Sequence, residues 1–238
     1  MQKPSAPSAS PLIPVWDVPT RLFHWLLVCL IATSWTTGEL GGDEWLRYHF
    51  WSGYAILTLV LFRIAWGVVG STHARFASFV RGVPSALQHL RELARPGPTS
   101  DLGHNAIGGW MIVVMLIALL VQTGTGLFAD DDIVTTGPLG DLVSSATRSR
   151  LTTVHVYNFD VILALAGLHI AAVLAYWIVK RQNLIGAMIT GRKRAPAADL
   201  GASAVAGVAA HPVVAAAALI GAAAVVAGIV GLVPYFAR

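Results

Sequence analysis

The chain has few charged residues and almost no cysteine. Charged residues make up 12% of its 238 residues, against about 25% in soluble globular domains, which excludes an ordinary soluble fold. The single cysteine, Cys29, cannot form an internal disulfide, a C-x-x-C-H haem attachment site or a cysteine-ligated iron–sulfur cluster. We therefore expect a membrane protein in which Cys29 is a small buried apolar residue.

Long apolar runs are abundant. A membrane-spanning helix needs about 20 mostly apolar residues, and five stretches meet this requirement. They predict an all-α membrane protein without a separate soluble domain. We expect residues 1–14, rich in Pro, Ser and Ala, to be disordered. The predicted spans are 21–38, 50–70, 106–128, 151–179 and 205–233.

The basic residues are sorted by loop. If the N-terminus is cytoplasmic, eleven basic residues lie on cytoplasmic segments and four on the opposite side, a positive-inside bias. The sequence pI of about 9.6 therefore reflects topology and contact with anionic lipid, and no nucleic-acid partner is expected. The eleven are Lys3, Arg21, Arg75, Arg81, Arg91, Arg95, Lys180, Arg181, Arg192, Lys193 and Arg194; the four are Arg47, Arg148, Arg150 and Arg238.

Four histidines in the first four predicted spans fall at two depths. His24 lies near the cytoplasmic start of the first span, and His49 near the opposite start of the second. In the fourth span His155 and His169 are 14 residues apart, close to four helical turns and about 21 Å along the axis. Both therefore project from nearly the same face, with His155 at the depth of His49 and His169 at that of His24.

Histidines paired in this way predict axial ligands of haem. Ionisable side chains are costly in a membrane, face the bundle interior and usually have a function. A haem iron takes one imidazole from either side, and helix bundles build cofactor sites from facing side chains. We predict two haem b groups, ligated by His24 with His169 and by His49 with His155. A histidine-lined metal transporter is an alternative, but the spans offer few carboxylates for a polar path.

Two arginines are candidates for contact with the cytoplasmic haem. Arg63 is 14 residues after His49 on the same helix face, and Arg21 is three residues before His24. A haem propionate would give either guanidinium a charge-assisted partner. Snorkelling to the lipid head groups is the alternative. His104, at the start of the third span, is a candidate for contact with a propionate or a quinone, or for a helix cap.

Several stretches resemble a known family. They are VWDVPTRLFHW (15–25), HFWSGYAILTLVLFRIAWG (49–67), GHNAIGGWMIVVMLIALLVQTGTG (103–126), HVYNFDVILALAGLHI (155–170) and MITGRK (188–193). Residues 15–193 thus resemble the prokaryotic cytochrome b561 family, which includes the cytochrome b subunits of membrane-bound nickel–iron hydrogenases. The His-x13-His spacing is the most specific element.

The resemblance implies a four-helix di-haem cytochrome b domain over residues 15–193, in a bacterial inner membrane, with the same four histidines as haem ligands and a quinone as one redox partner. We expect a subunit that carries electrons between a periplasmic redox protein, either a cytochrome c or a hydrogenase-like subunit, and the quinone pool. The alternative is a stand-alone oxidoreductase that oxidises a small periplasmic reductant and reduces quinone.

Residues 194–238 extend beyond this resemblance and predict a linker and a fifth transmembrane helix. In that helix a stripe of small residues recurs at spacings of four, three, four and three, which places them on one face. Small residues let another helix approach closely. The stripe predicts packing on the haem bundle or against a partner subunit, unless it arises by chance in an Ala-rich, Gly-rich span. Its members are Ala217, Gly221, Ala224, Gly228 and Gly231.

Overall fold

The computed structural model describes residues 12–82, 84–85, 106–131, 135–194 and 211–236. Five helices in these ranges are long and apolar enough to cross a membrane, and each overlaps a predicted span. The predicted all-α membrane fold with a fifth C-terminal helix is therefore confirmed. The five are α1 (Val18–Leu40), α2 (Gly42–Val69), α5 (Ala106–Gly126), α6 (Ser145–Val179) and α8 (Pro212–Phe236).

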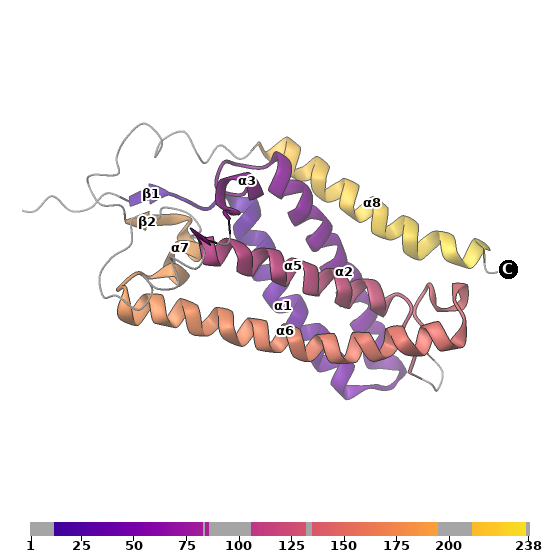
Figure 1. The fold of residues 1–238 in the computed structure, drawn as a ribbon. Helices are drawn as coiled ribbons and strands as arrows, with labels where there is room; N and C mark the ends of the chain where they lie inside the picture. The colour runs from indigo at the N-terminus through magenta and orange to yellow at the C-terminus, as the bar shows by residue number, and fades with distance from the viewer. Residues whose placement is uncertain (1–11, 83, 86–105, 132–134, 195–210, 237–238) are drawn as a thin grey trace, which may run out of the picture.

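The long helices form a bundle in which α2 is central. Helix α1 packs along α2, α5 packs along α6, and α2 also contacts α5 and α8. In Figure 1 α6 and α8 lie on opposite sides of α5, and the turn between α1 and α2 extends past α6. The main core joins Val60 of α2, Leu119 of α5 and Ile162 of α6. Ile162 is the one buried residue of α6, so most of the surface of this helix is exposed or half-buried. Cys29 of α1 is exposed, so its expected burial is wrong.

Local sequence signals explain the boundaries of α1. Asp17 caps its first turn, because the carboxylate accepts a hydrogen bond from the backbone N–H of Thr20 at 2.7 Å. At the other end, Gly41 and Gly42 both have positive φ values, 60° and 76°. Glycine adopts this conformation without steric cost, and the chain therefore turns directly from α1 into α2.

Short elements close the end of the bundle where α1 begins. Strand β1 (Leu12–Pro14) pairs antiparallel with β2 (Arg192–Arg194), which follows α7 (Leu184–Thr190). The predicted disorder of residues 1–14 is therefore wrong for Leu12–Pro14, whose backbone is held by this pairing; residues 1–11 lie outside the described residues. Helix α3 (Phe76–Phe79) follows α2, and a 3-10 turn, η1 (Gly140–Leu142), precedes α6.

Helix α8 packs on α2 through a face that the sequence did not predict. Ala222 is buried in a cluster with Phe62 and Trp66, and Val226 in a second cluster with Leu57. The predicted stripe lies on another face, where a Cβ atom added at Gly221, Gly228 or Gly231 would meet no atom of the described residues within 4 Å beyond the adjacent backbone of its own helix. Packing of the stripe on the haem bundle is therefore wrong. Its packing against a partner stays a prediction.

Candidate functional site

The structure brings the four predicted histidines together in the two predicted pairs. The ring centres of His24 and His169 are 6.4 Å apart, and those of His49 and His155 are 6.0 Å apart. With a metal–imidazole bond of about 2 Å on either side, the centres of two opposed imidazole rings lie about 6 Å apart. Each pair is therefore spaced to hold one metal ion between its rings.

Each pair offers two protein ligands. Within the described residues no group of three or more His, Cys, Asp or Glu side chains could hold a metal ion. A zinc site takes three or four protein ligands, whereas a haem brings its own equatorial nitrogens and needs only axial ligands from the protein. The donor set fits haem and does not fit a bare metal ion.

A cavity surrounds the His49–His155 pair. It has a volume of about 390 Å³, within the range of about 300–1,000 Å³ typical of ligand sites. Residues of α1, α2, α5 and α6 line it, and its walls include Trp35, Leu57 and Phe159. An apolar space of this kind, between helices and open to both imidazoles, suits a flat macrocycle.

The imidazoles of the His49–His155 pair are oriented by backbone carbonyls. Nδ1 of His49 lies 2.8 Å from the carbonyl oxygen of Ser34, and Nδ1 of His155 lies 2.9 Å from that of Gln122. A carbonyl oxygen only accepts, so Nδ1 carries the proton in both rings and Nε2 keeps its lone pair. Histidine ligands of metals commonly use this arrangement.

The side chain of Gln122 reaches the same site. Its amide nitrogen donates to Nε2 of His155 at 3.2 Å, and its amide oxygen accepts from Asn158 at 2.8 Å. The amide thus engages the atom that a metal would take, and ligation of His155 requires that this contact be released. Sequence reasoning missed both residues. An amide in an apolar span was the available signal, because buried polar groups in a membrane need partners.

Two glycines leave room for the imidazole rings. A Cβ atom at Gly38 of α1 would lie 3.0 Å from Nδ1 of His49, and one at Gly126 of α5 would lie 2.8 Å from Cε1 of His155. Any larger residue would press on the ring. The two glycines therefore hold open the positions in which Nδ1 meets its carbonyl partner.

Comparison with known proteins identifies the family. The sequence profile described as prokaryotic cytochrome b561 matches residues 15–191. The chain belongs to the prokaryotic cytochrome b561 family. The resemblance drawn from the sequence is thereby confirmed. The chain is a multi-pass bacterial membrane protein and a b-type cytochrome, with haem b as its cofactor and electron transport as its class of function.

The curated relatives of this cytochrome share a common description. A probable Ni/Fe-hydrogenase B-type cytochrome subunit of Rhizobium leguminosarum bv. viciae is 25% identical over 210 residues, which cover 75% of this chain and 87% of the relative. A protein of the same description from Rhodobacter capsulatus is 24% identical, with 75% and 80% covered. The probable Ni/Fe-hydrogenase 1 B-type cytochrome subunit of Escherichia coli (strain K12) is 26% identical, with 49% and 60% covered. No solved structure matches the chain.

The His24–His169 pair of the cytochrome is held differently. Nδ1 of His24 is buried and has no hydrogen-bond partner among the described residues. The ring stands edge-on to Trp25, with 4.9 Å between the ring centres. A buried ring nitrogen without a partner is uncommon in proteins, and in the described part of the chain His24 therefore lacks the backbone acceptor that orients His49 and His155.

Arg63 points into the bundle. It is 2% exposed, and its guanidinium carbon lies 5.1 Å from the ring centre of Phe76 and 5.9 Å from that of Phe79. Its Nη1 atom has no hydrogen-bond partner among the described residues, although Asp17 is close enough to act on its charge. Snorkelling to the head groups is therefore wrong for Arg63, and contact with a haem propionate stays a prediction.

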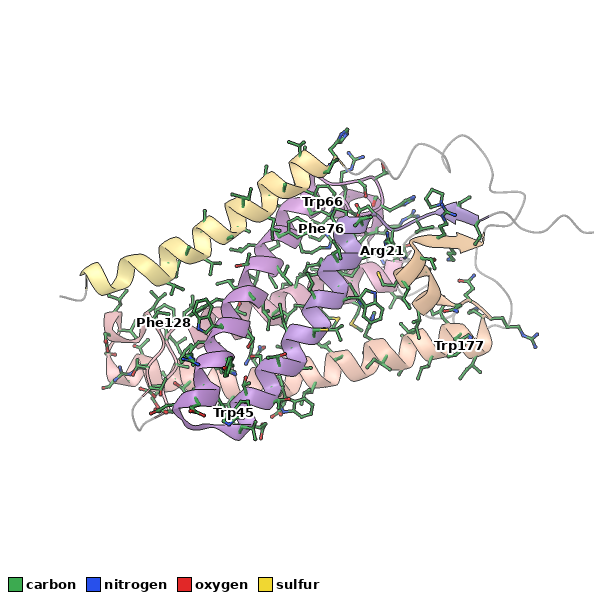
Figure 2. The ribbon with its side chains drawn as sticks, turned by 180° about the vertical axis from the view of Figure 1, so that it is seen from behind. Arg21, Trp45, Trp66, Phe76, Phe128 and Trp177 are labelled. Carbon is green, nitrogen blue, oxygen red and sulfur yellow. The ribbon has the colours of Figure 1, made fainter. Side chains whose placement is uncertain are left out.

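Arg21 has a structural partner. Its Nη1 donates to the carbonyl oxygen of Ile189 at 2.6 Å and so holds α7 against α1, while its Nε atom is buried without a partner in the described part of the chain. Figure 2 shows Arg21 at the same end of the bundle as Trp66 and Phe76, away from Trp45 and Phe128. Its contact with a propionate stays a prediction. His104 lies outside the described residues.

Proposed function

We propose that the chain is a di-haem cytochrome b in which His24 and His169 ligate one haem and His49 and His155 ligate the other. The observation that carries the proposal is the spacing of the rings, 6.4 Å and 6.0 Å between their centres, in two pairs that each supply two ligands. The pairs lie about 21 Å apart along α6, from the 14 residues between His155 and His169.

When bound, haem supplies a centre that takes up and releases one electron. Both histidines of a pair would hold the haem iron, which would leave the iron no open ligand position for oxygen chemistry and would suit electron transfer alone. The carbonyls of Ser34 and Gln122 orient two of the ligands. Arg63, and with it Arg21, would neutralise the propionates of the haem on the His24–His169 pair.

The charge distribution supports an orientation. Eleven basic residues on one side against four on the other favour a cytoplasmic N-terminus in the bacterial inner membrane. The His49–His155 pair then lies near the periplasm and the His24–His169 pair near the cytoplasm. Electrons would pass between a periplasmic redox protein and the membrane quinone pool by way of both haems.

The curated relatives favour a hydrogenase-like subunit as the periplasmic partner, since their descriptions name hydrogenase cytochrome subunits. The periplasmic loops are acidic, with Glu39, Asp43, Glu44, Asp130, Asp131, Asp132 and Asp141. In the structure Arg148 pairs with Asp130 at 2.6 Å and with Asp141 at 3.4 Å. The acidic composition of these loops would attract a partner with a basic patch, such as a cytochrome c. Association with that partner would then weaken as salt rises.

The alternative function is a stand-alone oxidoreductase that oxidises a small periplasmic reductant. Quinone reduction by the isolated chain with such a reductant would favour this alternative. Dependence on an added redox protein, which also co-purifies with the chain, would favour the subunit.

Haem stoichiometry of the purified chain tests the proposal. We expect two haem b groups per chain in the pyridine haemochrome assay, and a reduced-minus-oxidised spectrum typical of six-coordinate haem. The variant His211→Ala, which changes an exposed histidine, should also retain two. One haem per chain, or bound metal without haem absorbance, would contradict the proposal.

A further inference from the structure

The two histidine pairs differ in the hydrogen bonds that their Nδ1 atoms make. In the His49–His155 pair both Nδ1–H groups donate to backbone carbonyl oxygens, at 2.8 Å and 2.9 Å. In the other pair, Nδ1 of His24 is buried without a partner in the described part of the chain. The two sites therefore share their ligand type and differ at His24, because both ligands of the His49–His155 pair have a backbone acceptor behind the ring and His24 has none among the described residues.

This difference has an electronic consequence. A carbonyl that accepts the Nδ1 proton draws it away from the ring and makes the imidazole a more basic, more electron-donating ligand. A more electron-donating axial ligand stabilises the ferric over the ferrous state. Hydrogen bonding behind axial ligands is one of the means by which proteins set haem potentials, so the His49–His155 pair should hold its haem at the lower reduction potential.

Fixed charges act in the same direction. The residues that line the cavity around the His49–His155 pair include Glu39, Asp130 and Asp131, and their negative charge disfavours reduction. Asp130 is paired with Arg148, and Glu39 and Asp131 are exposed, so screening makes this contribution small. Near the His24–His169 pair the buried guanidinium of Arg63 favours reduction, and the buried carboxylate of Asp17 offsets part of this effect.

We propose that the carbonyls of Ser34 and Gln122 make the cytochrome electronically asymmetric, with the haem of the His49–His155 pair at a lower reduction potential than the haem of the His24–His169 pair. One electron on the chain then resides mainly on the His24–His169 side. Transfer between the haems oxidises one iron and reduces the other and needs no further reactant. The inference rests on the proposed di-haem function.

Redox titrations of variants that keep one haem compare the two sites. His169→Ala should keep the haem of the His49–His155 pair, and His155→Ala that of the His24–His169 pair. We expect the haem of His169→Ala to have the lower reduction potential. The difference should be at least tenfold in the reduction equilibrium, or 59 mV for one electron. Equal or reversed potentials would overturn the inference alone. Failure of the parent chain to bind two haems would overturn the proposed function, and the inference with it.

Substitution of the two glycines tests the cause of the asymmetry. In Gly126→Ala the new Cβ presses on His155, at 2.8 Å from Cε1 and 3.1 Å from Nδ1, and moves Nδ1 off the Gln122 carbonyl. The potential of that haem should rise toward the other. In Gly38→Ala the new Cβ presses less strongly on His49, because it lies 3.0 Å from Nδ1. This variant replaces Gly126→Ala as the test if Gly126→Ala loses the haem.

Gly124→Ala is the matched control. It adds the same methyl group to the same helix, α5, at a position where the new Cβ would meet no atom of the described residues within 4 Å beyond the adjacent helix backbone, so both potentials should stay at the parent values. If Gly38→Ala retains both haems and shifts neither potential relative to this control, the carbonyl hydrogen bonds do not set the asymmetry and the inference is wrong.

Discussion

The carboxylate of Asp17 accepts a hydrogen bond from the indole N–H of Trp66, with 3.0 Å between the two atoms, and so joins the start of α1 to the end of α2. The same carboxylate accepts from the Ser71 hydroxyl and from the backbone N–H of Thr20. Asp17 is 3% exposed. A single buried side chain therefore caps α1 and fixes the two helices that carry His24 and His49.

Replacement of Asp17 should destabilise the bundle. Asp17→Ala leaves the Trp66 and Ser71 donors buried without a partner, at about 1–3 kcal/mol each, and removes the cap of α1, worth about 1 kcal/mol. Asp17→Asn should lose less, because its amide oxygen still accepts. Thermal unfolding of the detergent-solubilised protein measures both against Glu44→Ala, an exposed control. A parent-like melting temperature for Asp17→Ala would contradict this role.

Arg63 should retain the haem of the His24–His169 pair. Arg63→Gln removes a buried positive charge that a propionate would otherwise meet, and a hydrogen bond to a charged group is worth about 1.5–3 kcal/mol. Loss of that haem to a scavenging protein should be faster by about tenfold or more. Arg47→Gln, an exposed arginine on the same helix, is the control. Equal loss rates in the two variants would show that Arg63 contacts no propionate.

The two faces of α8 should respond differently to added volume. Ala222→Phe overfills the contact with Phe62 and Trp66 and should cost about 1–3 kcal/mol. Gly221→Leu adds volume where no atom lies within 4 Å, and the isolated chain should melt like the parent. If the double variant Gly221→Leu, Gly228→Leu also associates with its partner normally, the stripe faces only lipid.

His73 should make stability depend on pH. Burial lowers the pKa of His73 below its ordinary value of 6.5, and the Asp17 carboxylate offsets part of this decrease. As pH falls, His73 takes up a proton in the unfolded chain before it does so in the folded chain. The contribution of neutral His73 to the free energy of unfolding is therefore complete above about pH 6.5 and is lost as pH falls through the lower pKa of the folded state. His73→Gln should show a smaller fall in melting temperature from about pH 7 to 5 than His211→Gln, its exposed control. Equal falls would contradict the prediction.

The sequence alone predicted the spans and the pairing of the histidines. Both follow from the fixed geometry of the α-helix, in which the 14 residues between His155 and His169 set both a depth and a face. The sequence left open whether Arg63 faces inward or snorkels to the head groups, because its orientation depends on Phe76 and Phe79, which belong to α3 and return against α2 only in the folded chain.

Other features carry no signal in the sequence. The acceptors for His49 and His155 are backbone carbonyls, which every residue possesses, and only the packing of the helices selects those of Ser34 and Gln122. The three-residue strands β1 and β2 are too short for a periodic pattern. In α8 almost every residue is small and apolar, so the buried face around Ala222 cannot be distinguished by composition from the exposed stripe.

The central claim is that each haem is held by one depth-matched pair of histidines. Haem counting by pyridine haemochrome in the four single variants His24→Ala, His49→Ala, His155→Ala and His169→Ala tests it most directly. Each variant should keep one haem. The spectrum and potential of the remaining haem should agree between His49→Ala and His155→Ala, and between His24→Ala and His169→Ala. Retention of two haems by His169→Ala, or agreement across the pairs instead of within them, would contradict the account.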